Sequence, residues 1–280
     1  MPTLPVSKKQ LDRLGDRLRD ASTPSAGDSE LLEAVLGAYD EALQAVRGRL
    51  RQLGFDPTVR LKTTGTIIDK LRRDRSSSLK TIHDLAGARI VLSGTLRDQD
   101  AAVRAVVTAF TDGTTVPSVI DRRADPRSGY RAVHVILRID GLPVEVQFRT
   151  ELQDLWAQLF ERLADVWGRQ IRYGGPPDDV GLSSRTAEAR RTIVELLLSS
   201  SKAMGEHEGR SARFVDLGIP ALLRNAGVDV STRNEDVPAE VREVHFTYLH
   251  YVRSEALAEE ALRNMLTKVA EAVEGEVIDG

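Results

Sequence analysis

The chain has 280 residues, of which 41% are hydrophobic and 29% charged, and its formal net charge is −3. The absence of cysteine excludes disulfides, thiolate metal sites and cysteine nucleophiles. Because no apolar run approaches a membrane span and residues 1–10 lack the apolar centre of a signal peptide, we expect a cytoplasmic protein.

Positive charge is concentrated in one part of this acidic chain. Between Arg47 and Arg89 there are eleven Lys and Arg residues and four Asp residues, which gives a local charge of +7. A basic segment of this kind indicates a polyanionic ligand. The plain alternative is a solvated helix face, which we favour for the arginines at the end of the long helix, residues 47–51.

Two helices are expected first in the chain. A short one over residues 9–19 lies in a polar segment, and a long one runs from Asp28 or Ser29 to Leu53 and stops at Gly54. The apolar residues of the long helix are spaced by alternating steps of three and four. This spacing predicts one narrow buried stripe.

The next segment brings cations to the start of a helix. Thr66, with Asp69 three positions on, looks like a capping arrangement and predicts that a helix starts there and carries Lys70. Arg60 and Lys62 lie upstream on an extended segment, on the same side because side chains alternate. Cations beside a hydroxyl-rich turn and a helix N-terminus suit phosphate groups, although Lys and Arg flank many helix starts.

Asp84 stands at the entrance to a buried strand over residues 88–93. It is a candidate ligand or catalytic carboxylate, and the plain alternative is a turn or a helix cap. His83 beside it would suit a metal-dependent hydrolase, but the chain lacks further His and Asp residues at suitable spacing. A helix over residues 97–110 and a strand over residues 116–121 are expected next.

The most informative segment spans residues 130–149. Asp140-Gly141, between two alternating runs, is the strongest short signal for a two-residue hairpin turn. In the register that this turn fixes, one face of the hairpin is entirely apolar. The other face carries His134, Glu145, Gln147 and Arg149, with Tyr130 at its edge. This mixture indicates a functional site, and the plain alternative is a sheet face in contact with water.

Asp84 and Glu145 are expected on strands of one sheet. Two carboxylates of this kind are able to hold a Mg²⁺ ion, which prefers a few carboxylates together with phosphate oxygens of the substrate. The five histidines are scattered and do not suggest a zinc site.

The rest of the chain is expected to be mainly helical. The predicted segments are an amphipathic helix over 151–167, a Gly/Pro-rich break at 172–179, a helix over 184–204, a stretch that tends to alternate over 241–252, and a final helix over 254–273. Strands interleaved with helices, closing with an antiparallel hairpin, predict an α+β fold in which helices pack on a mixed β-sheet. We expect an N-terminal segment (1–27), a central domain (28–175) and a mainly helical C-terminal region (176–280).

Four motifs occur in order along the central domain. They are Arg60-x-Lys62-x-x-x-Thr66-x-x-x-Lys70, then Asp84-Leu-Ala-Gly-Ala-Arg89, then Gly129-Tyr130-Arg-Ala-Val-His134, then Val144-Glu145-Val-Gln147-Phe-Arg149, and Trp156-Ala157 follows. Their order and spacing resemble the synthetase domain of the RelA/SpoT family in its short, single-domain form. The resemblance implies a nucleotidyltransferase-like synthetase domain with helical N- and C-terminal extensions, without the family's hydrolase domain or long regulatory tail.

The resemblance implies an ATP-dependent diphosphotransferase of the GTP pyrophosphokinase type. Such an enzyme transfers the β,γ-pyrophosphate of ATP to the ribose 3′-hydroxyl of GDP or GTP and makes the alarmones (p)ppGpp of the stringent response. By resemblance the catalytic residues are Glu145, Asp84 and His134, with Mg²⁺ as cofactor on Asp84 and Glu145. The residues implied for ATP are Arg60, Lys62, Thr66, Lys70 and Arg89, and those implied for the acceptor are Tyr130, Gln147 and Arg149.

The Asp121-Arg122-Arg123 segment, the Gln153 helix and the Tyr-Gly-Gly ending are similar to a toxic branch of the small synthetases. The family usually has a Glu-His pair and then Tyr-Lys after the Trp-Ala helix, where this chain has Glu161-Arg162 and Tyr173-Gly174-Gly175. An alternative function is therefore pyrophosphorylation of the 3′ end of tRNA, as a toxin or in phage defence, or synthesis of adenosine alarmones. A second alternative is an inactive nucleotide-sensing module. A tRNA, an antitoxin protein and a second copy of the chain stay open as partners beside ATP and a guanine nucleotide.

Overall fold

The computed structural model describes residues 3–75, 78–113 and 115–278, and the chain divides into two compact units. The first unit comprises Met1–Leu92, Asp100–Asp121 and Ala132–Arg149, and the second comprises Ser93–Gln99, Arg122–Arg131 and Thr150–Gly280. Each unit is built around its own buried apolar residues. None of the helices in the described ranges combines the length and apolarity needed to cross a membrane.

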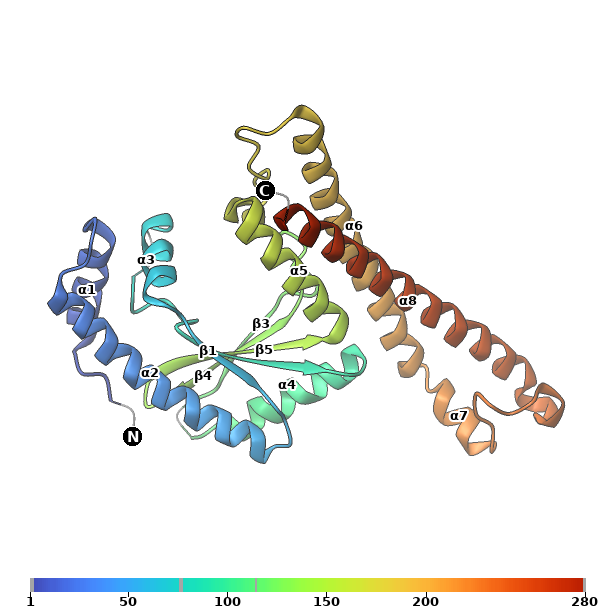
Figure 1. Ribbon diagram of the computed structural model, residues 1–280. Helices are drawn as coiled ribbons and strands as arrows, with labels where there is room; N and C mark the ends of the chain where they lie inside the picture. Colours follow the sequence, from blue (N-terminus) through green and yellow to red (C-terminus); the bar gives the residue numbers. More distant parts are fainter. Residues whose placement is uncertain (1–2, 76–77, 114, 279–280) are drawn as a thin grey trace. The chain divides into compact units, whose positions relative to one another are not determined.

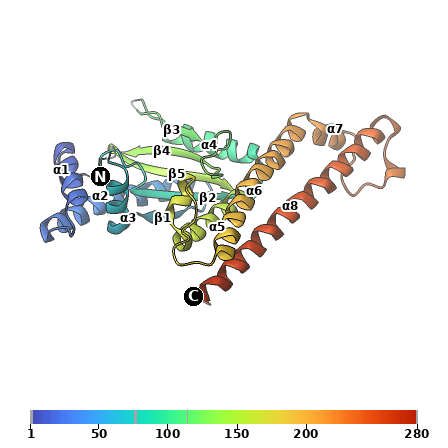
Figure 2. The same cartoon turned by 90° about the horizontal axis from the view of Figure 1, so that it is seen from above.

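The first unit contains a five-stranded sheet (Figure 1), whose order β1-β2-β5-β4-β3 is seen in Figure 2. The strands are β1 (Thr58–Leu61), β2 (Ala86–Leu92), β3 (Ser118–Asp121), β4 (Val133–Ile139) and β5 (Leu142–Thr150). Three pairs, β1 with β2, β3 with β4 and β4 with β5, are antiparallel. The predicted fold class, a mixed sheet with packed helices, is confirmed.

Helices of the first unit share one apolar core with this sheet. They are α1 (Lys8–Asp20), α2 (Ala26–Gln52), α3 (Thr64–Arg73) and the part of α4 (Leu96–Phe110) from residue 100 on. The long helix α2 runs along β1, β2 and β4 (Figure 1). Its leucines and valines share one core with the apolar side chains of the strands.

The β4–β5 hairpin has the register that the sequence predicts. Asp140 and Gly141 form the turn with φ angles of 49° and 84°, the positive values that a two-residue hairpin turn requires and that Asp and Gly tolerate. His134 pairs with Gln147 and Ile136 with Glu145. The valines and leucines between them are buried in the core.

The start of α3 differs from the prediction. Thr63, three residues before Thr66, is the N-cap, and its side chain accepts a hydrogen bond from the backbone N of Thr66 at 3.4 Å. Thr66 lies in the first turn, where its hydroxyl donates to the backbone carbonyl of Thr63 at 2.8 Å. The run Thr63-Thr64-Gly65-Thr66 has four hydroxyl-bearing or small residues and so offers several caps, and Thr63 is the one whose side chain pairs a backbone N–H of the first turn.

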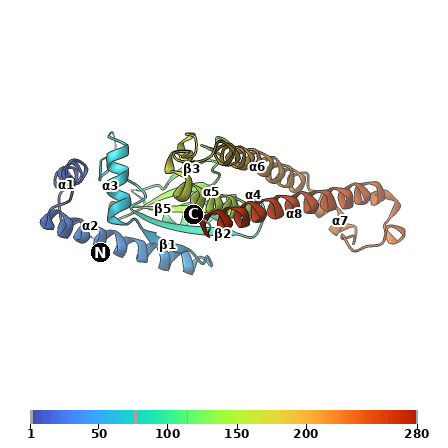
Figure 3. The same cartoon turned by 45° about the horizontal axis from the view of Figure 1, so that its top comes forward.

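The second unit is helical. Its main helices are α5 (Glu151–Trp167), α6 (Ser184–Asp216), α7 (Ile219–Asn225) and α8 (Arg242–Ile278), with short 3₁₀ turns at Arg169–Tyr173, Asn234–Asp236 and Ala239–Val241. Helix α5 has the predicted bounds and begins with a capping box between Thr150 and Gln153. Helices α6 and α8 lie side by side over much of their length, which Figures 2 and 3 show from two further directions.

The alternating stretch over residues 241–252 is not extended; from Arg242 it belongs to α8. Val241, Val244 and Tyr248 pack on one small apolar cluster, and their spacing of three and four is that of a helix face. The sequence seemed to alternate because polar residues separate the apolar residues of this helix face. Helix α6 is likewise longer than predicted and ends at Asp216.

Candidate active site

One face of the sheet in the first unit carries polar side chains. In β4 and β5, Val133, Val135, Val144 and Val146 are buried in the core. Since successive side chains of a strand point to opposite faces, His134, Glu145 and Gln147 share the other face. In β1 and β2, where Arg60 pairs with Gly87, the same alternation puts Arg60 and Arg89 on this face.

Glu145 lies in a chain of directed hydrogen bonds. Arg149 Nη2 donates to Gln147 Oε1 at 3.0 Å, and Gln147 Nε2 donates to Glu145 Oε1 at 2.8 Å. The second carboxylate oxygen of Glu145 lies 3.5 Å from His134 Nδ1. Because the Gln147 amide has a donor at one end and an acceptor at the other, its orientation is fixed, and with it that of the carboxylate.

The electrostatics of this chain keep Glu145 ionised. Burial raises the pKa of the Glu145 carboxyl. The hydrogen bond and charge of His134, together with the Gln147 amide, lower this pKa by more than burial raises it, so the pKa lies below its usual value. The negative charge of Asp84 acts on the same group and raises its pKa. The two carboxylates therefore act on each other electrostatically, although Asp84 lies in the turn before β2 and not on a strand as expected.

Asp84 is held by two lysines. Lys62 Nζ donates to Asp84 Oδ2 and Lys70 Nζ donates to Asp84 Oδ1, each at 2.7 Å. The three side chains are between 25% and 30% exposed, so the cluster is open to a ligand. Burial raises the pKa of Asp84, but the two ammonium groups together lower it below its usual value.

This cluster joins three elements of the first unit. Lys62 follows β1 and is fixed by its backbone N, which donates to the carbonyl of Leu85 at 2.8 Å. Asp84 precedes β2, and Lys70 lies on α3, whose N-terminal turn holds Thr66. The sequence predicted cations at the start of a helix and, separately, a candidate carboxylate at Asp84, but not these two ion pairs. Their partners are separated by 22 and 14 residues, and no local pattern signals such a contact.

The donor set is compatible with Mg²⁺ on the two carboxylates. Within the described ranges, no three His, Cys, Asp or Glu side chains are grouped so that they could hold a metal ion. Asp84 and Glu145 nevertheless fit the usual requirement of Mg²⁺, one or two carboxylates with the remaining ligands from water and phosphate. A metal on Asp84 would displace at least one lysine from it.

Other residues predicted for the site have different environments. Arg60 is exposed, Arg89 is half-buried and Arg149 is 1% exposed. Arg149 donates a hydrogen bond to Gln147, and its direct contact with an acceptor stays a prediction. Tyr130 belongs to the second unit, where it packs against the apolar core of α5, α6 and α8.

Gly87 in β2 was not singled out by the sequence. A Cβ at this position would lie 3.8 Å from the backbone carbonyls of both Arg60 and Glu145. The glycine thus lies between the strand that carries the cation and the strand that carries the carboxylate, and it leaves the polar face open there. The sequence feature that could have indicated Gly87 is the run of small residues between Asp84 and Arg89.

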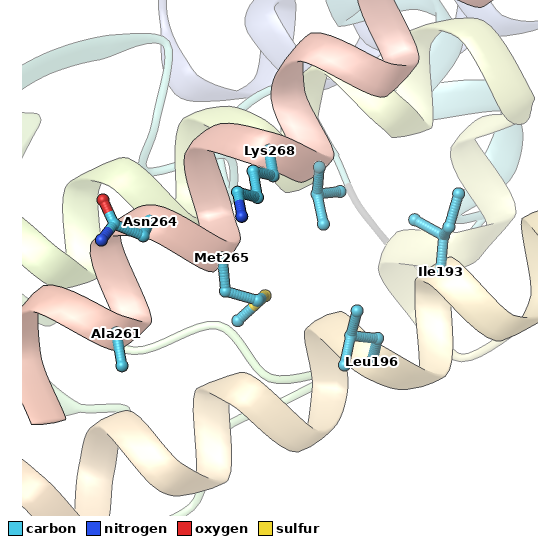
Figure 4. Close-up of a pocket in the computed structure, with 7 residues that line it drawn as sticks. Ile193, Leu196, Ala261, Asn264, Met265 and Lys268 are labelled. Atoms are coloured by element: carbon cyan, nitrogen blue, oxygen red, sulfur yellow. The ribbon is translucent and has the colours of Figure 1, made fainter.

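The second unit contains a groove of a different character. It has a volume of about 460 Å³ and lies between α6 and α8, where Ile193, Leu196 and Met265 line it (Figure 4). Lys268 and Asn264 are the polar members of its lining. With one cation and no carboxylate, this groove lacks the groups that a nucleotide and a metal ion need.

Comparisons with known proteins find a family match over the segment that includes the polar face. The family model described as "Region found in RelA / SpoT proteins" matches residues 59–163. An uncharacterized protein of Mycobacterium tuberculosis is 34% identical over 221 residues, which cover 77% of this chain and 80% of that protein.

Solved structures give matches at lower identity. The small alarmone synthetase 1 from Bacillus subtilis is 21% identical with a TM-score of 0.46 and covers 65% of this chain and 98% of its own. The small alarmone synthetase 2 from the same organism is 21% identical with a TM-score of 0.45 and covers 60% and 93%. On the family model and the M. tuberculosis relative, the chain belongs to the RelA/SpoT family and is an enzyme of its pyrophosphotransferase type.

Proposed function

We propose that the chain is a Mg²⁺-dependent nucleotide pyrophosphokinase that uses ATP as donor and GDP or GTP as acceptor, and so makes (p)ppGpp. The observation that supports this proposal most is the ionised Glu145 on the polar face, held by His134 and Gln147 and within the electrostatic reach of Asp84. Lys62 and Lys70, which form ion pairs with Asp84, supply positive charge for the phosphate groups.

In the proposed reaction, the 3′-oxygen of the acceptor ribose forms a bond to the β-phosphorus of ATP. The bond between that phosphorus and the oxygen shared with the α-phosphate breaks, and AMP leaves. Glu145 accepts the proton of the 3′-hydroxyl. Because its pKa is lowered, the carboxyl is deprotonated at neutral pH and is able to act as a base. His134 orients the carboxylate through the contact at Oε2.

Charge neutralisation is the second task of the site. The triphosphate brings several negative charges, and Arg60, Lys62, Lys70 and Arg89 are the cations proposed to bind them. Asp84 and Glu145 would hold Mg²⁺, which when bound neutralises phosphate charge. Transfers of this type depend mainly on positioning and electrostatic stabilisation, and this set of side chains provides both.

The deciding experiment follows the label from γ-labelled ATP. Purified protein is incubated with Mg²⁺ and, in separate reactions, GDP, GTP, ATP alone and bulk tRNA, and the products are separated. We expect labelled guanosine products. Label on tRNA alone or on adenosine products alone would contradict the guanosine acceptor, and the absence of label from every acceptor would favour a nucleotide-sensing module.

The tRNA alternative makes its own prediction about salt. Binding to tRNA should weaken steeply as salt rises, because cations such as those of residues 72–75 would release counterions, whereas mononucleotide binding should not. In the first unit, Arg72 donates hydrogen bonds to the backbone carbonyls of Arg19, Ala21 and Ser22. This use of Arg72 inside the fold favours the mononucleotide.

Tyr130 is proposed to stack on the base of the acceptor. Replacing it with Ala is expected to raise the KM for the acceptor by roughly 10-fold, in the range of stacking energies, and to leave the KM for ATP within about 2-fold. Tyr130→Phe keeps the ring and should stay near wild type. Tyr173→Ala, an exposed tyrosine of the same unit, is the matched control. Equal loss of ATP and acceptor binding in Tyr130→Ala would contradict stacking.

A further inference from the structure

We propose that helix α6 positions Tyr130 for the acceptor base through Ser201 and Gly205. This inference rests on the proposed function, in which Tyr130 contacts the acceptor base. It assigns a task to a region for which the sequence suggested none.

One stripe of α6 contacts the segment that contains Tyr130. Leu198, Ser201, Gly205 and Glu208 follow one another at steps of three and four, and so they share a helix face. All four lie in the second unit, as does the segment of residues 129–131.

Ser201 binds the residues on both sides of Tyr130. Its hydroxyl donates a hydrogen bond to the backbone carbonyl of Gly129. The Nε of Arg131 donates to the backbone carbonyl of Ser201 at 3.0 Å and reaches its hydroxyl at 3.2 Å. The backbone of Tyr130 is therefore anchored to α6 at its preceding and its following residue.

Gly129 fits against two large side chains. It has a φ of +80°, and a Cβ at this position would lie 2.7 Å from Cζ2 of Trp156 and 3.2 Å from Cδ2 of Leu198. Trp156 is itself fixed, because its indole N–H donates to the carbonyl of Leu197 at 2.8 Å. The chain before Tyr130 thus lies directly on the contact between α5 and α6.

Gly205 makes room for the guanidinium of Arg131. A Cβ at Gly205 would lie 2.5 Å from Cζ and 2.6 Å from Nη1 of Arg131, closer than real Cβ contacts. The guanidinium has little freedom to withdraw, since Nη1 also donates to the carbonyl of Arg123 while Nε is bonded to Ser201. A side chain at position 205 would have to displace this group.

Glu208 extends the same contact to the start of α5. Its carboxylate accepts hydrogen bonds from the hydroxyl of Thr150 and, at 2.9 Å, from the amide of Gln153, which are the N-cap and the third residue of α5. Burial raises the pKa of Glu208, and these hydrogen bonds and Arg131 oppose the rise. Helix α6 therefore joins the loop of Tyr130 to the beginning of the next helix.

The test uses glycine substitutions on the same helix. Gly205→Ala adds a methyl group against Arg131, whereas Gly209→Ala, one turn further on, adds one where nothing lies within 4 Å. Alanine favours a helix more than glycine, so both changes should strengthen α6 as a helix. If α6 only supported the fold, neither substitution would change the KM for the acceptor.

Two readouts separate positioning from general stability. Initial rates with γ-labelled ATP give the KM for the acceptor, the KM for ATP and kcat. Hydrogen exchange, measured without nucleotide, reports on the amide of Tyr130, which donates to the carbonyl of Arg127 at 3.0 Å. Ser201→Ala is measured in the same way, with the exposed Ser199→Ala as its control.

We expect Gly205→Ala and Ser201→Ala to raise the acceptor KM by roughly 10-fold, with ATP KM and kcat within about 2-fold, and to speed exchange at Tyr130. Gly209→Ala and Ser199→Ala should match wild type.

If wild type is active and all four variants behave alike, the inference is overturned and the proposed function stands. Loss of thermal stability with parallel changes in all kinetic constants also overturns it. A wild type that labels no acceptor refutes the proposed function and this inference with it.

Discussion

Glu145→Gln is expected to slow transfer of label from ATP to the acceptor by roughly 10³-fold, the size of effect typical for loss of a general base. Glutamine keeps the length of the side chain and an oxygen that accepts from the Gln147 amide. It removes the negative charge and the ability to accept the proton of a hydroxyl. The far-ultraviolet circular dichroism spectrum should stay unchanged, because the core face of β5 is untouched.

The matched control is Glu41→Gln, on the exposed side of α2 in the same unit, which should transfer label at the wild-type rate. Transfer close to wild type in Glu145→Gln would remove Glu145 from the catalytic residues. Rescue at higher pH is not expected from the glutamine, since it has no proton to lose in this range.

The same variant has a consequence for stability in acid. The pKa of Glu145 is lower in the fold than its ordinary value. Its ionisation therefore stabilises the fold at any pH above the carboxyl pKa of the unfolded chain, about 4.3, and this contribution is lost as pH falls through the lower pKa of the folded state. The free energy of unfolding of Glu145→Gln should consequently fall less steeply in this acid range than that of wild type. Denaturant titrations at several pH values measure this difference.

Asp84→Asn is expected to be the second most damaging change, with transfer reduced by ~10²-fold to ~10³-fold, comparable to loss of a group that organises charge in the transition state. The structural reason is that Asp84 is the shared anion of Lys62 and Lys70. Without its charge the two ammonium groups repel each other, and neither is directed toward a phosphate. A metal bound at this carboxylate would also lose its ligand, so added Mg²⁺ should not restore the rate.

A moderate loss of stability should accompany Asp84→Asn, on the order of 1 kcal/mol for a partly exposed ion-pair cluster. The double variant Asp84→Asn with Lys62→Met removes the repulsion, and should regain stability while transfer stays low. Asp56→Asn, which removes an exposed pair with Arg51, controls for loss of a surface ion pair. If the double variant regained the transfer rate as well, the loss in Asp84→Asn would be a stability effect and Asp84 would leave the catalytic set.

The parts of the fold that sequence reasoning predicted well are those determined locally. Asp140-Gly141 sets the hairpin turn, and the period of two then assigns every side chain of β4 and β5 to a face. The capping box of Thr150 and Gln153 likewise fixes where α5 begins. Half of the polar face, from His134 to Arg149, follows from this hairpin alone.

The other half depends on contacts between distant segments. Asp84 and Glu145 share an electrostatic site because β2 lies next to β5 in the sheet, an order that no local pattern specifies. The ion pairs of Asp84 and the anchoring of Gly129 by Ser201, 72 residues away, are of the same kind. The short helical stripe of Val241, Val244 and Tyr248 was missed because its periodicity over few residues resembles alternation.

The series of hydrogen bonds from Arg149 through Gln147 to Glu145 bears on the reorganisation energy of the proposed reaction. Arg149 is withdrawn from water and points its donor at one end of an amide whose other end grips the carboxylate. Rotating that carboxylate would break a bond made when the protein folded, so its alignment is settled before any substrate arrives. In the proposed reaction, little reorganisation energy would then remain to be supplied during turnover.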